Sequence, residues 1–314
     1  MRTPPTTFRA LLPALVLALP LAACSTESEM RADDPSDPGV AGAPSGDGSG
    51  MPTAVPAADG PVRTAGLVTV LDSGTGPQLC SAVAESYPPQ CSGLPIEGWS
   101  WKDNPMHESA SGTRWGSFAL VGTFDGEAFT VTDATPAALY DPMAEPDDPS
   151  LTTPCEEPDG GWKVLDPSKT TPETMDATFV AASALPDYAS AWMDQSINPA
   201  STSDDPAVQE SEMNDPELTI INVVVTGDPA AAEAELRRTW GGMLCVSTAE
   251  VTEREMLAIQ EDLSDLPGLQ SSGSVETDVL DATVLFDDGS IQEWADATYG
   301  EGRVRISSLL VPAE

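Results

Sequence analysis

Residues 218–247, LTIINVVVTGDPAAAEAELRRTWGGMLCVS, place a strand, a helix and a second strand in direct succession. Leu218 to Thr226 is rich in β-branched residues, which favours a strand. Asp228-Pro229 matches a helix N-cap followed by the first helical position, and the helix is expected to run to Trp240. The two glycines after it let the chain leave the helix and enter a strand over Met243 to Ser247.

The same order recurs at the C-terminus. Val279 to Phe286 has the composition of a strand, and Asp287 to Ser290 is a capping sequence that begins a helix. Val304 to Val311 is expected to be the last strand. Asp228 to Trp240 and Asp287 to Tyr299 each span 12 positions, and each is followed by glycine and a strand. The spacing therefore indicates an internal duplication.

A helix and a strand precede each of these units. In the first unit, Pro172 to Leu185 has a helical pattern and Tyr188 to Gln195 has a strand pattern. In the second unit, Thr252 begins a helix with a capping box that runs to Leu266-Pro267, and a weak strand over Gln270 to Val275 follows it. We therefore predict two αββαβ-like repeats whose helices cover one face of a sheet, an open-faced α/β sandwich over residues 151–314. Chance similarity between two α/β segments is the alternative. The order also resembles that of small extracytoplasmic α/β modules such as BON domains, a resemblance of topology that implies no function.

Residues 63–150 have a different pattern. Leu67 to Leu71 and Leu94 to Trp101 are expected to be strands, and Asp125-Gly126 is a hairpin signal between Trp115 to Thr123 and Glu127 to Asp133. This predicts a small β-rich N-terminal domain, either a partly open barrel or a short sandwich, and Asp141 to Pro149 is expected to be a connector. The predicted fold class is α+β.

The N-terminus carries an export signal. Arg2 and Arg9 precede an apolar run, and Leu21-Ala22-Ala23-Cys24 resembles the lipobox of bacterial lipoproteins. That resemblance implies a signal peptide over residues 1–23, a lipid (diacylglyceryl, palmitate-type) modification at Cys24, and a location on the extracytoplasmic face of the cell membrane. A transmembrane helix is the alternative, but roughly 12 apolar residues are too few to cross about 30 Å of hydrocarbon. Residues 24–62 lack apolar periodicity and are expected to be a disordered tether.

Charge restricts the partners. The chain has 51 acidic and 13 basic residues, a net charge of −38. Such a field repels phosphate backbones, so nucleic acid is not an expected partner. The membrane is reached through the lipid anchor, and any electrostatically selected partner is expected to be cationic or divalent. Acidity that only keeps the domain soluble and monomeric is the simpler interpretation.

Four cysteines remain besides Cys24. Cys80, Cys91, Cys155 and Cys245 are an even number in an exported chain, which predicts two disulfides with three possible connectivities. We favour Cys80–Cys91 as a local loop and Cys155–Cys245 as a long-range link, with the crossed pairings left open. No C-x-x-C spacing points to a zinc or redox site.

Aromatic residues and the single histidine form one candidate binding surface. Trp99 and Trp101 share a face of a strand, Trp115 follows across a polar loop, and His107 lies in that loop. Exposed, they are suited to stacking on sugar rings or apolar peptide side chains. The alternative is that the tryptophans fill the core of a small domain and that His107 is a solvated loop residue.

No cofactor, metal or catalytic residue is expected. The chain has no G-x-S-x-G elbow and no H-E-x-x-H pair. The acidic insertion Asp204 to Glu217 is dense in oxygen ligands, but no run matches a calcium-binding loop, so solvated charge is the preferred interpretation.

Two sets of residues suggest a family. Over residues 66–312 the chain resembles a group of uncharacterised actinobacterial lipoproteins. The first set of residues that carries this resemblance is Gln78-Leu79-Cys80, Ser86 to Gly93 and Gly98-Trp99, and the second set is Trp240 to Ser247 and Tyr299-Gly300. The resemblance implies an exported, disulfide-linked, membrane-anchored architecture and no activity. We expect a binding or interaction module at the cell envelope, with a protein, peptide or glycan as ligand. The alternative is a hydrolase of cell-wall polymer that depends on two carboxylates.

Overall fold

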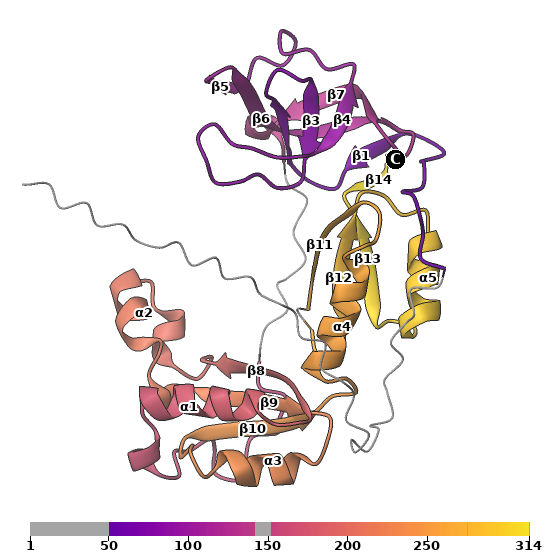
Figure 1. Cartoon of the computed structure of the whole chain (residues 1–314). Coiled ribbons are helices and arrows are strands. Elements are labelled where there is room, and N and C mark those ends of the chain that lie inside the picture. The colour runs from indigo at the N-terminus through magenta and orange to yellow at the C-terminus, as the bar shows by residue number, and fades with distance from the viewer. Residues whose placement is uncertain (1–49, 142–151, 275, 314) are drawn as a thin grey trace, which may run out of the picture. The chain divides into compact units, whose positions relative to one another are not determined.

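The computed structural model describes residues 50–141, 152–274 and 276–313. In these residues the chain forms an eight-stranded sheet and two three-stranded sheets, with helices on the smaller sheets (Figure 1). This is the predicted α+β class. None of the helices in this part of the chain is long and apolar enough to span a bilayer.

The N-terminal sheet is a small barrel. Its strands are β1 (Val62–Thr64), β2 (Val68–Asp72), β3 (Pro77–Cys80), β4 (Leu94–Glu97), β5 (Glu108–Ala110), β6 (Thr113–Phe124) and β7 (Phe129–Pro136). Pairing runs from β6 through β2, β3, β4 and β7 and returns to β6, so these strands close on themselves. The closing contact is the parallel β4–β7 pair, between strands distant in sequence. Sequence reasoning had left a partly open barrel or a sandwich, because it had no signal for this pair.

The predicted hairpin at Asp125-Gly126 is confirmed. The Asp125 carboxylate accepts hydrogen bonds from the amides of Glu127 and Ala128, and Gly126 has a φ of +97°. These donors hold the pKa of Asp125 below its usual range. The turn joins β6 to β7, whose Phe124 and Phe129 point into the barrel core.

The first repeat contains the predicted elements. They are α1 (Pro172–Ser183), β8 (Tyr188–Asp194), β9 (Ile220–Val225), α3 (Pro229–Leu236) and β10 (Met243–Thr248). Helix α3 ends four residues before the expected Trp240, because the chain turns there: the amides of Thr239 and Trp240 both donate to the Leu236 carbonyl. Helices α1 and α3 pack on the face of the sheet that carries Ile221, Val223 and Val225.

The second repeat has the same order. Its elements are α4 (Glu253–Leu263), β11 (Leu269–Gly273), β12 (Leu280–Val284), α5 (Ser290–Tyr299) and β13 (Val304–Ser308). In both sheets the central strand pairs antiparallel with the first strand and parallel with the third. The predicted duplication is therefore present in the topology, although the repeats form two separate sheets and not one.

Local details are duplicated as well. Both α1 and α4 begin with a capping box, at Thr171 and Thr252. The first strand of each repeat has a register shift at the same place, after Tyr188 and after Leu269. Matching caps and matching bulges are hard to reconcile with chance similarity between two α/β segments.

The two ends of the described chain join the barrel to the second repeat. The expected last strand is divided: β13 stays in the second repeat, and β14 (Leu310–Pro312) pairs with β1. At the other end, Val55 and Ala58 pack on the barrel core and Met51 on the core of the second repeat. The segment expected to be a tether through residue 62 is thus in contact with both cores from Met51 onward, because it carries apolar side chains that these cores accommodate.

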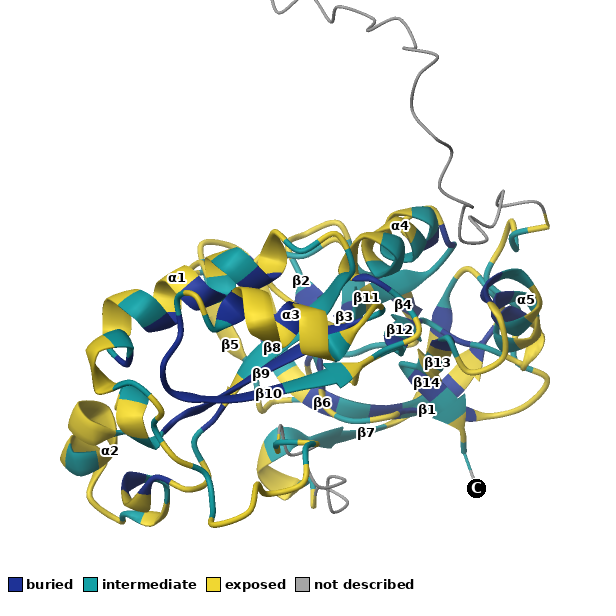
Figure 2. Cartoon of the chain, turned by 90° about the horizontal axis from the view of Figure 1, so that it is seen from below, coloured by how far each residue is buried: buried dark blue, intermediate teal, exposed yellow. Residues whose placement is uncertain are grey.

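The two repeats differ on the sheet face that lacks helices. All six residues of β9 are buried, as Figure 2 shows, whereas β12 alternates between buried and partly exposed positions. The outer face of the first sheet is covered by the segment that carries Cys155 and Trp162, which pack on Ile220 and Met243. The sandwich is therefore open-faced only in the second repeat.

Candidate functional site

The predicted aromatic surface of the barrel is largely packed. Trp101 and Trp115 are only 8% and 9% exposed, and the partly buried Trp99 contacts both Trp101 and Phe118 edge to face, at 5.2 Å and 4.9 Å between ring centroids. A ring whose faces contact other rings offers little area for stacking. The tryptophans therefore behave as core residues, the alternative that the sequence left open.

His107 is held next to this cluster. Its ring lies 4.8 Å from that of Trp101, and its Nδ1 is 2.9 Å from the carbonyl oxygen of Asn104. The Trp101 indole donates to Asp72. Burial favours a higher pKa for Asp72, but donors from Gly74, Trp101 and Gly76 outweigh it and leave that pKa below its usual range. These contacts fix a loop; they do not prepare a general base.

The exposed aromatic residue of this region is one that the sequence reasoning did not single out. Tyr87 is 75% exposed and meets the Trp115 ring edge to face at 5.4 Å. It lies in the loop closed by the Cys80–Cys91 disulfide. The position of Tyr87 in a loop was not enough to predict from the sequence that its ring would be exposed.

Both favoured disulfides, Cys80–Cys91 and Cys155–Cys245, are present in the structure. The second attaches the covering segment to β10, and Thr153 in the same segment donates twice to the carboxylate of the buried Asp194. Burial opposes ionisation of Asp194, but hydrogen bonds from Ser196 and Thr153 lower its pKa below the usual range. The predicted lipidation site Cys24 and the connector at residues 142–149 lie outside the described residues.

The acidic insertion is folded. It contains α2 (Pro206–Glu212) and most of η4 (Pro216–Leu218), and it follows directly after η3 (Pro199–Thr202). Asp205 and Asp215 accept hydrogen bonds from backbone amides at the starts of α2 and η4, and the buried Asn198 donates to the carbonyls of Glu212 and Met213. Its polar side chains therefore organise the segment locally.

We expect EDTA to leave the melting temperature of the full-length protein unchanged. Over the described ranges no group of three or more His, Cys, Asp or Glu side chains is arranged to hold a metal ion. A differential scanning fluorimetry pair with and without EDTA tests this, with Asp205→Asn as the comparison. A fall in melting temperature on EDTA addition, absent in Asp205→Asn, would make the insertion a metal site.

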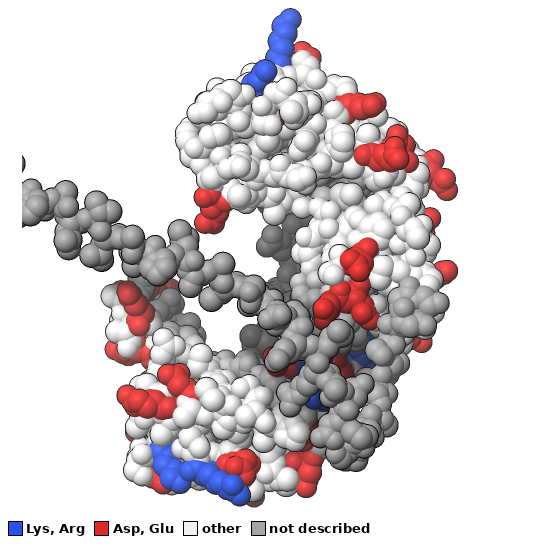
Figure 3. All heavy atoms as spheres, viewed as in Figure 1, with Lys and Arg blue, Asp and Glu red and all other residues white. Residues whose placement is uncertain are grey.

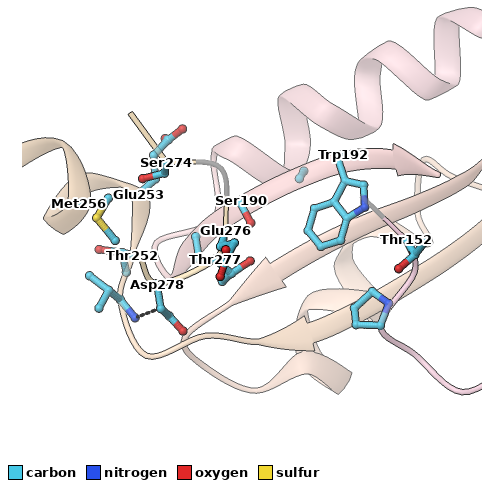
Figure 4. Close-up of a pocket in the computed structure, with 14 residues that line it drawn as sticks. Thr152, Ser190, Trp192, Thr252, Glu253, Met256, Ser274, Glu276, Thr277 and Asp278 are labelled. Atoms are coloured by element: carbon cyan, nitrogen blue, oxygen red, sulfur yellow. Dashed lines mark hydrogen bonds between the residues drawn. The ribbon is translucent and has the colours of Figure 1, made fainter. Parts of the chain in front are cut away.

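A pocket lies between the two repeats. Its volume is about 570 Å³, within the range typical of ligand sites. Figure 4 shows Trp192 and Thr152 on one side, Met256 and Thr252 on the other, and Ser190 between them. The remaining lining residues are Pro154, Ala189, Ala191, Val251, Glu253, Ser274, Glu276, Thr277 and Asp278.

Two buried polar atoms lie on the β8–β9 face beside this pocket. Among the described residues, the Ser190 hydroxyl oxygen in the pocket wall has no hydrogen-bond partner, and neither has the side-chain oxygen of Asn222, which is fully buried opposite Trp192. A buried polar group without a partner costs about 1–3 kcal/mol. Such groups are expected where a ligand or water completes the hydrogen bonding.

Carboxylates form one wall of the pocket. Asp278 accepts from the amides of Glu250 and Val251 and lies 3.6 Å from an Arg303 nitrogen. The φ of Asp278 is +68°. Glu276, which lines the pocket, forms an ion pair with Arg305, which does not; a guanidinium nitrogen of Arg305 lies 3.2 Å from a carboxylate oxygen of Glu276.

Glu253 faces the first repeat across the pocket. Burial, and then the charge of Glu253, raise the pKa of Tyr188 in β8. The lining contains no lysine or arginine among the described residues. Figure 3 shows the same imbalance over the visible surface, with acidic side chains widely spread and basic ones in a few places. The pocket is therefore suited to neutral or cationic groups.

The carboxyl groups with a clear pKa shift lie outside the pocket lining. In the described part of the chain every carboxyl group with a clear pKa shift has that pKa lowered. A glycosidase-type general acid needs the opposite shift.

Sequence reasoning missed this pocket because its residues are ordinary hydroxyl, alanine and carboxylate side chains with no motif. It forms from β8 in one copy and from the start of α4 and the β11–β12 loop in the other. Only the packing of the two copies brings these together. Compared with protein-family models, with curated proteins and with solved structures, the chain matches none.

Proposed function

We propose that this chain is a lipid-anchored extracytoplasmic protein that binds a protein, peptide or glycan of the cell envelope through the pocket between its repeats. The observation that carries this proposal is the pocket itself, of about 570 Å³, whose wall contains a buried Ser190 hydroxyl without a hydrogen-bond partner among the residues that the structure describes. Two disulfides, Cys80–Cys91 and Cys155–Cys245, support an oxidising compartment. Binding accounts for these features without a catalytic pair.

Anchoring is tested at Cys24. We expect the Cys24→Ser protein to lack the lipid and to leave the membrane fraction, because the lipid is attached through a thioether bond and serine has no sulfur atom to form it. Detergent-phase partitioning and intact-mass measurement of the purified chain check this. A Cys24→Ser protein that still partitions with membranes and retains residues 1–23 would contradict the lipobox interpretation.

Binding is tested with isolated envelope material and the full-length protein in detergent. Ser274→Trp places a large side chain at an exposed pocket position, and Ser271→Trp is the matched control at an exposed position of β11 outside the lining. We expect Ser274→Trp alone to reduce the retained fraction. Equal retention of both variants would reject the pocket as the binding site, and release of soluble fragments that grows with time would favour the hydrolase.

A further inference from the structure

We propose, building on the proposed function, that Asp278 holds the hinge between the two repeats and so controls the pocket that lies over this hinge. The repeats are joined by residues 249–252, which connect the end of β10 to the start of α4. In proteins that move about a hinge, a few residues of this kind absorb the backbone rotation. The bonds that hold this linker therefore limit how far one repeat can rotate against the other.

The linker changes its hydrogen-bond partner after its first residue. The amide of Ala249 donates to the carbonyl of Val225, in β9 of the first repeat. The next two amides, of Glu250 and Val251, donate to the carboxylate of Asp278 at 2.9–3.0 Å. Asp278 lies just before β12, in the second repeat. The hinge is therefore between Ala249 and Glu250, and Asp278 holds its second side.

Arg303, which directly precedes β13, contacts the same groups. Its guanidinium donates to the backbone carbonyl of Asp278 at 2.6 Å and to the carboxylate of Glu250 at 2.9 Å. The Arg303 side chain is 17% exposed, whereas that of Glu250 is 79% exposed, so the bonds of Asp278 are screened less by solvent than the pair with Glu250. Bonds from amides to a carboxylate are also stronger than bonds between neutral groups. We call Asp278 with Glu250, Val251 and Arg303 the Asp278 clamp.

The first repeat has a different arrangement at the matching position. Thr219 stands nine positions before Asp228, as Asp278 stands nine positions before Asp287. Thr219 is buried, and its hydroxyl donates to the carbonyl of Asp215 in the acidic insertion. The repeats share their capping boxes and their bulges, so these belong to the repeat as a unit. A contact of the second repeat with the linker belongs instead to the junction.

The clamp is also part of the pocket wall. Val251 and Asp278 line the pocket together with Thr252 and Glu253, and Ser190 of the first repeat lies on the other side of the hinge (Figure 4). Walls on opposite sides of a hinge change their separation when the hinge rotates. A ligand that contacts both walls binds only the fraction of molecules in which they are correctly spaced. Asp278 is therefore a positioning residue for the pocket.

Two substitutions of Asp278 separate its charge from its backbone conformation. Asp278 has a φ of +68°, which glycine and asparagine adopt more readily than other residues. Asp278→Gly removes the carboxylate without straining the backbone. Asp278→Asn keeps one acceptor oxygen without the charge, and it keeps the proposal testable if the glycine variant does not fold. The matched control is Asp281→Asn, which removes a carboxylate bonded to Arg305 outside the pocket lining.

The test uses full-length protein in detergent and measures the hinge by two methods. Hydrogen exchange followed by mass spectrometry reports on the amides of Glu250 and Val251. Pulsed electron paramagnetic resonance gives the distance between spin labels at Ser183→Cys and Ala297→Cys, which are exposed positions of α1 and α5. We expect Asp278→Gly to accelerate exchange of the two amides at least tenfold and to broaden the distance distribution at least twofold.

Binding is measured on the same variants through retention of isolated envelope material. We expect Asp278→Gly to reduce the retained fraction at least twofold. Asp278→Asn should give smaller changes in exchange, label distance and retention, and Asp281→Asn should match the unchanged protein in all three.

The hinge measurements separate failure of this proposal from failure of the proposed function. Faster exchange with an unchanged label distance would show that Asp278 only orders the start of α4, and the hinge proposal would be wrong. A broadened distance with full retention would show that the hinge does not control binding, which also overturns the proposal. Retention that does not respond to Ser274→Trp would reject the proposed function, whatever the label distances show.

Discussion

Replacing Cys155 and Cys245 by serine is expected to destabilise the first repeat by about 4.6 kcal/mol on the chain-entropy model. The two cysteines are 90 residues apart, so the disulfide removes much of the freedom of the unfolded chain. The loss also frees the segment that covers Ile220 and Met243 on the outer face of the sheet. Urea unfolding followed by tryptophan fluorescence measures the shift.

The matched control is the double serine variant at Cys80 and Cys91. Its two cysteines are only 11 positions apart in sequence, and the same model gives about 2.8 kcal/mol. We also expect the Cys155/Cys245 variant to bind a hydrophobic dye, because Ile220 and Met243 lose their cover, whereas the Cys80/Cys91 variant does not. A larger loss of stability in the Cys80/Cys91 variant would show that the covering segment is held mainly by other contacts, such as those of Thr153 with Asp194.

Trp240→Ala is expected to lower the free energy of unfolding by about 3–5 kcal/mol, the usual cost of removing a buried tryptophan. Trp240 is 1% exposed in the core of the first repeat, and its indole nitrogen donates to the Met243 carbonyl at 2.9 Å. Removing the ring leaves a cavity and an unpaired carbonyl. Chemical denaturation of the full-length chain, with near-ultraviolet circular dichroism as a second probe, measures the effect.

The duplicated position provides the control. Tyr299 occupies the place of Trp240 in the second repeat, but its buried hydroxyl has no hydrogen-bond partner within the described structure. Burial, and then the charge of Asp262, raise the pKa of Tyr299 to about 12. Tyr299→Phe should therefore leave stability unchanged or increase it slightly. A loss above about 1 kcal/mol in Tyr299→Phe would mean that the hydroxyl is in fact bonded.

Most of the secondary structure of the repeats was predictable because local chemistry determines it. Thr252 with Glu255 forms the capping box that its spacing indicates, and Asp228 caps α3 through the Ala230 amide. Such signals depend only on neighbours within a turn. The positions of the strands followed from β-branched composition in the same way.

The divided last strand shows where local reasoning ends. Val304 to Val311 reads as one strand, yet Val304–Ser308 pairs with β12 and Leu310–Pro312 with β1. The break depends on a partner more than 240 positions away in sequence. No local pattern carries that information, because the same alternation suits either sheet.

Gly241 and Gly300 follow the duplicated helical segments in the sequence and give the same signal, but they are required for different structural reasons. A side chain at Gly241 would clash with the backbone oxygen of Asp166, whereas Gly300 has open space around it and a φ of +99°. The sequence predicted a chain exit at both. Only the packed structure distinguishes a close backbone approach from a left-handed conformation.

By itself, the sequence determined the fold class and the duplicated order of elements, because these follow from periodicity and capping. It favoured the disulfide pairing Cys80–Cys91 and Cys155–Cys245 without excluding the crossed pairings, and the structure contains the favoured one. The tertiary structure decided the closure of the barrel, the covered face of the first sheet and the pocket between the repeats. Each of these depends on surfaces from distant segments meeting, and the free energy of that contact is not encoded in any single stretch of the chain.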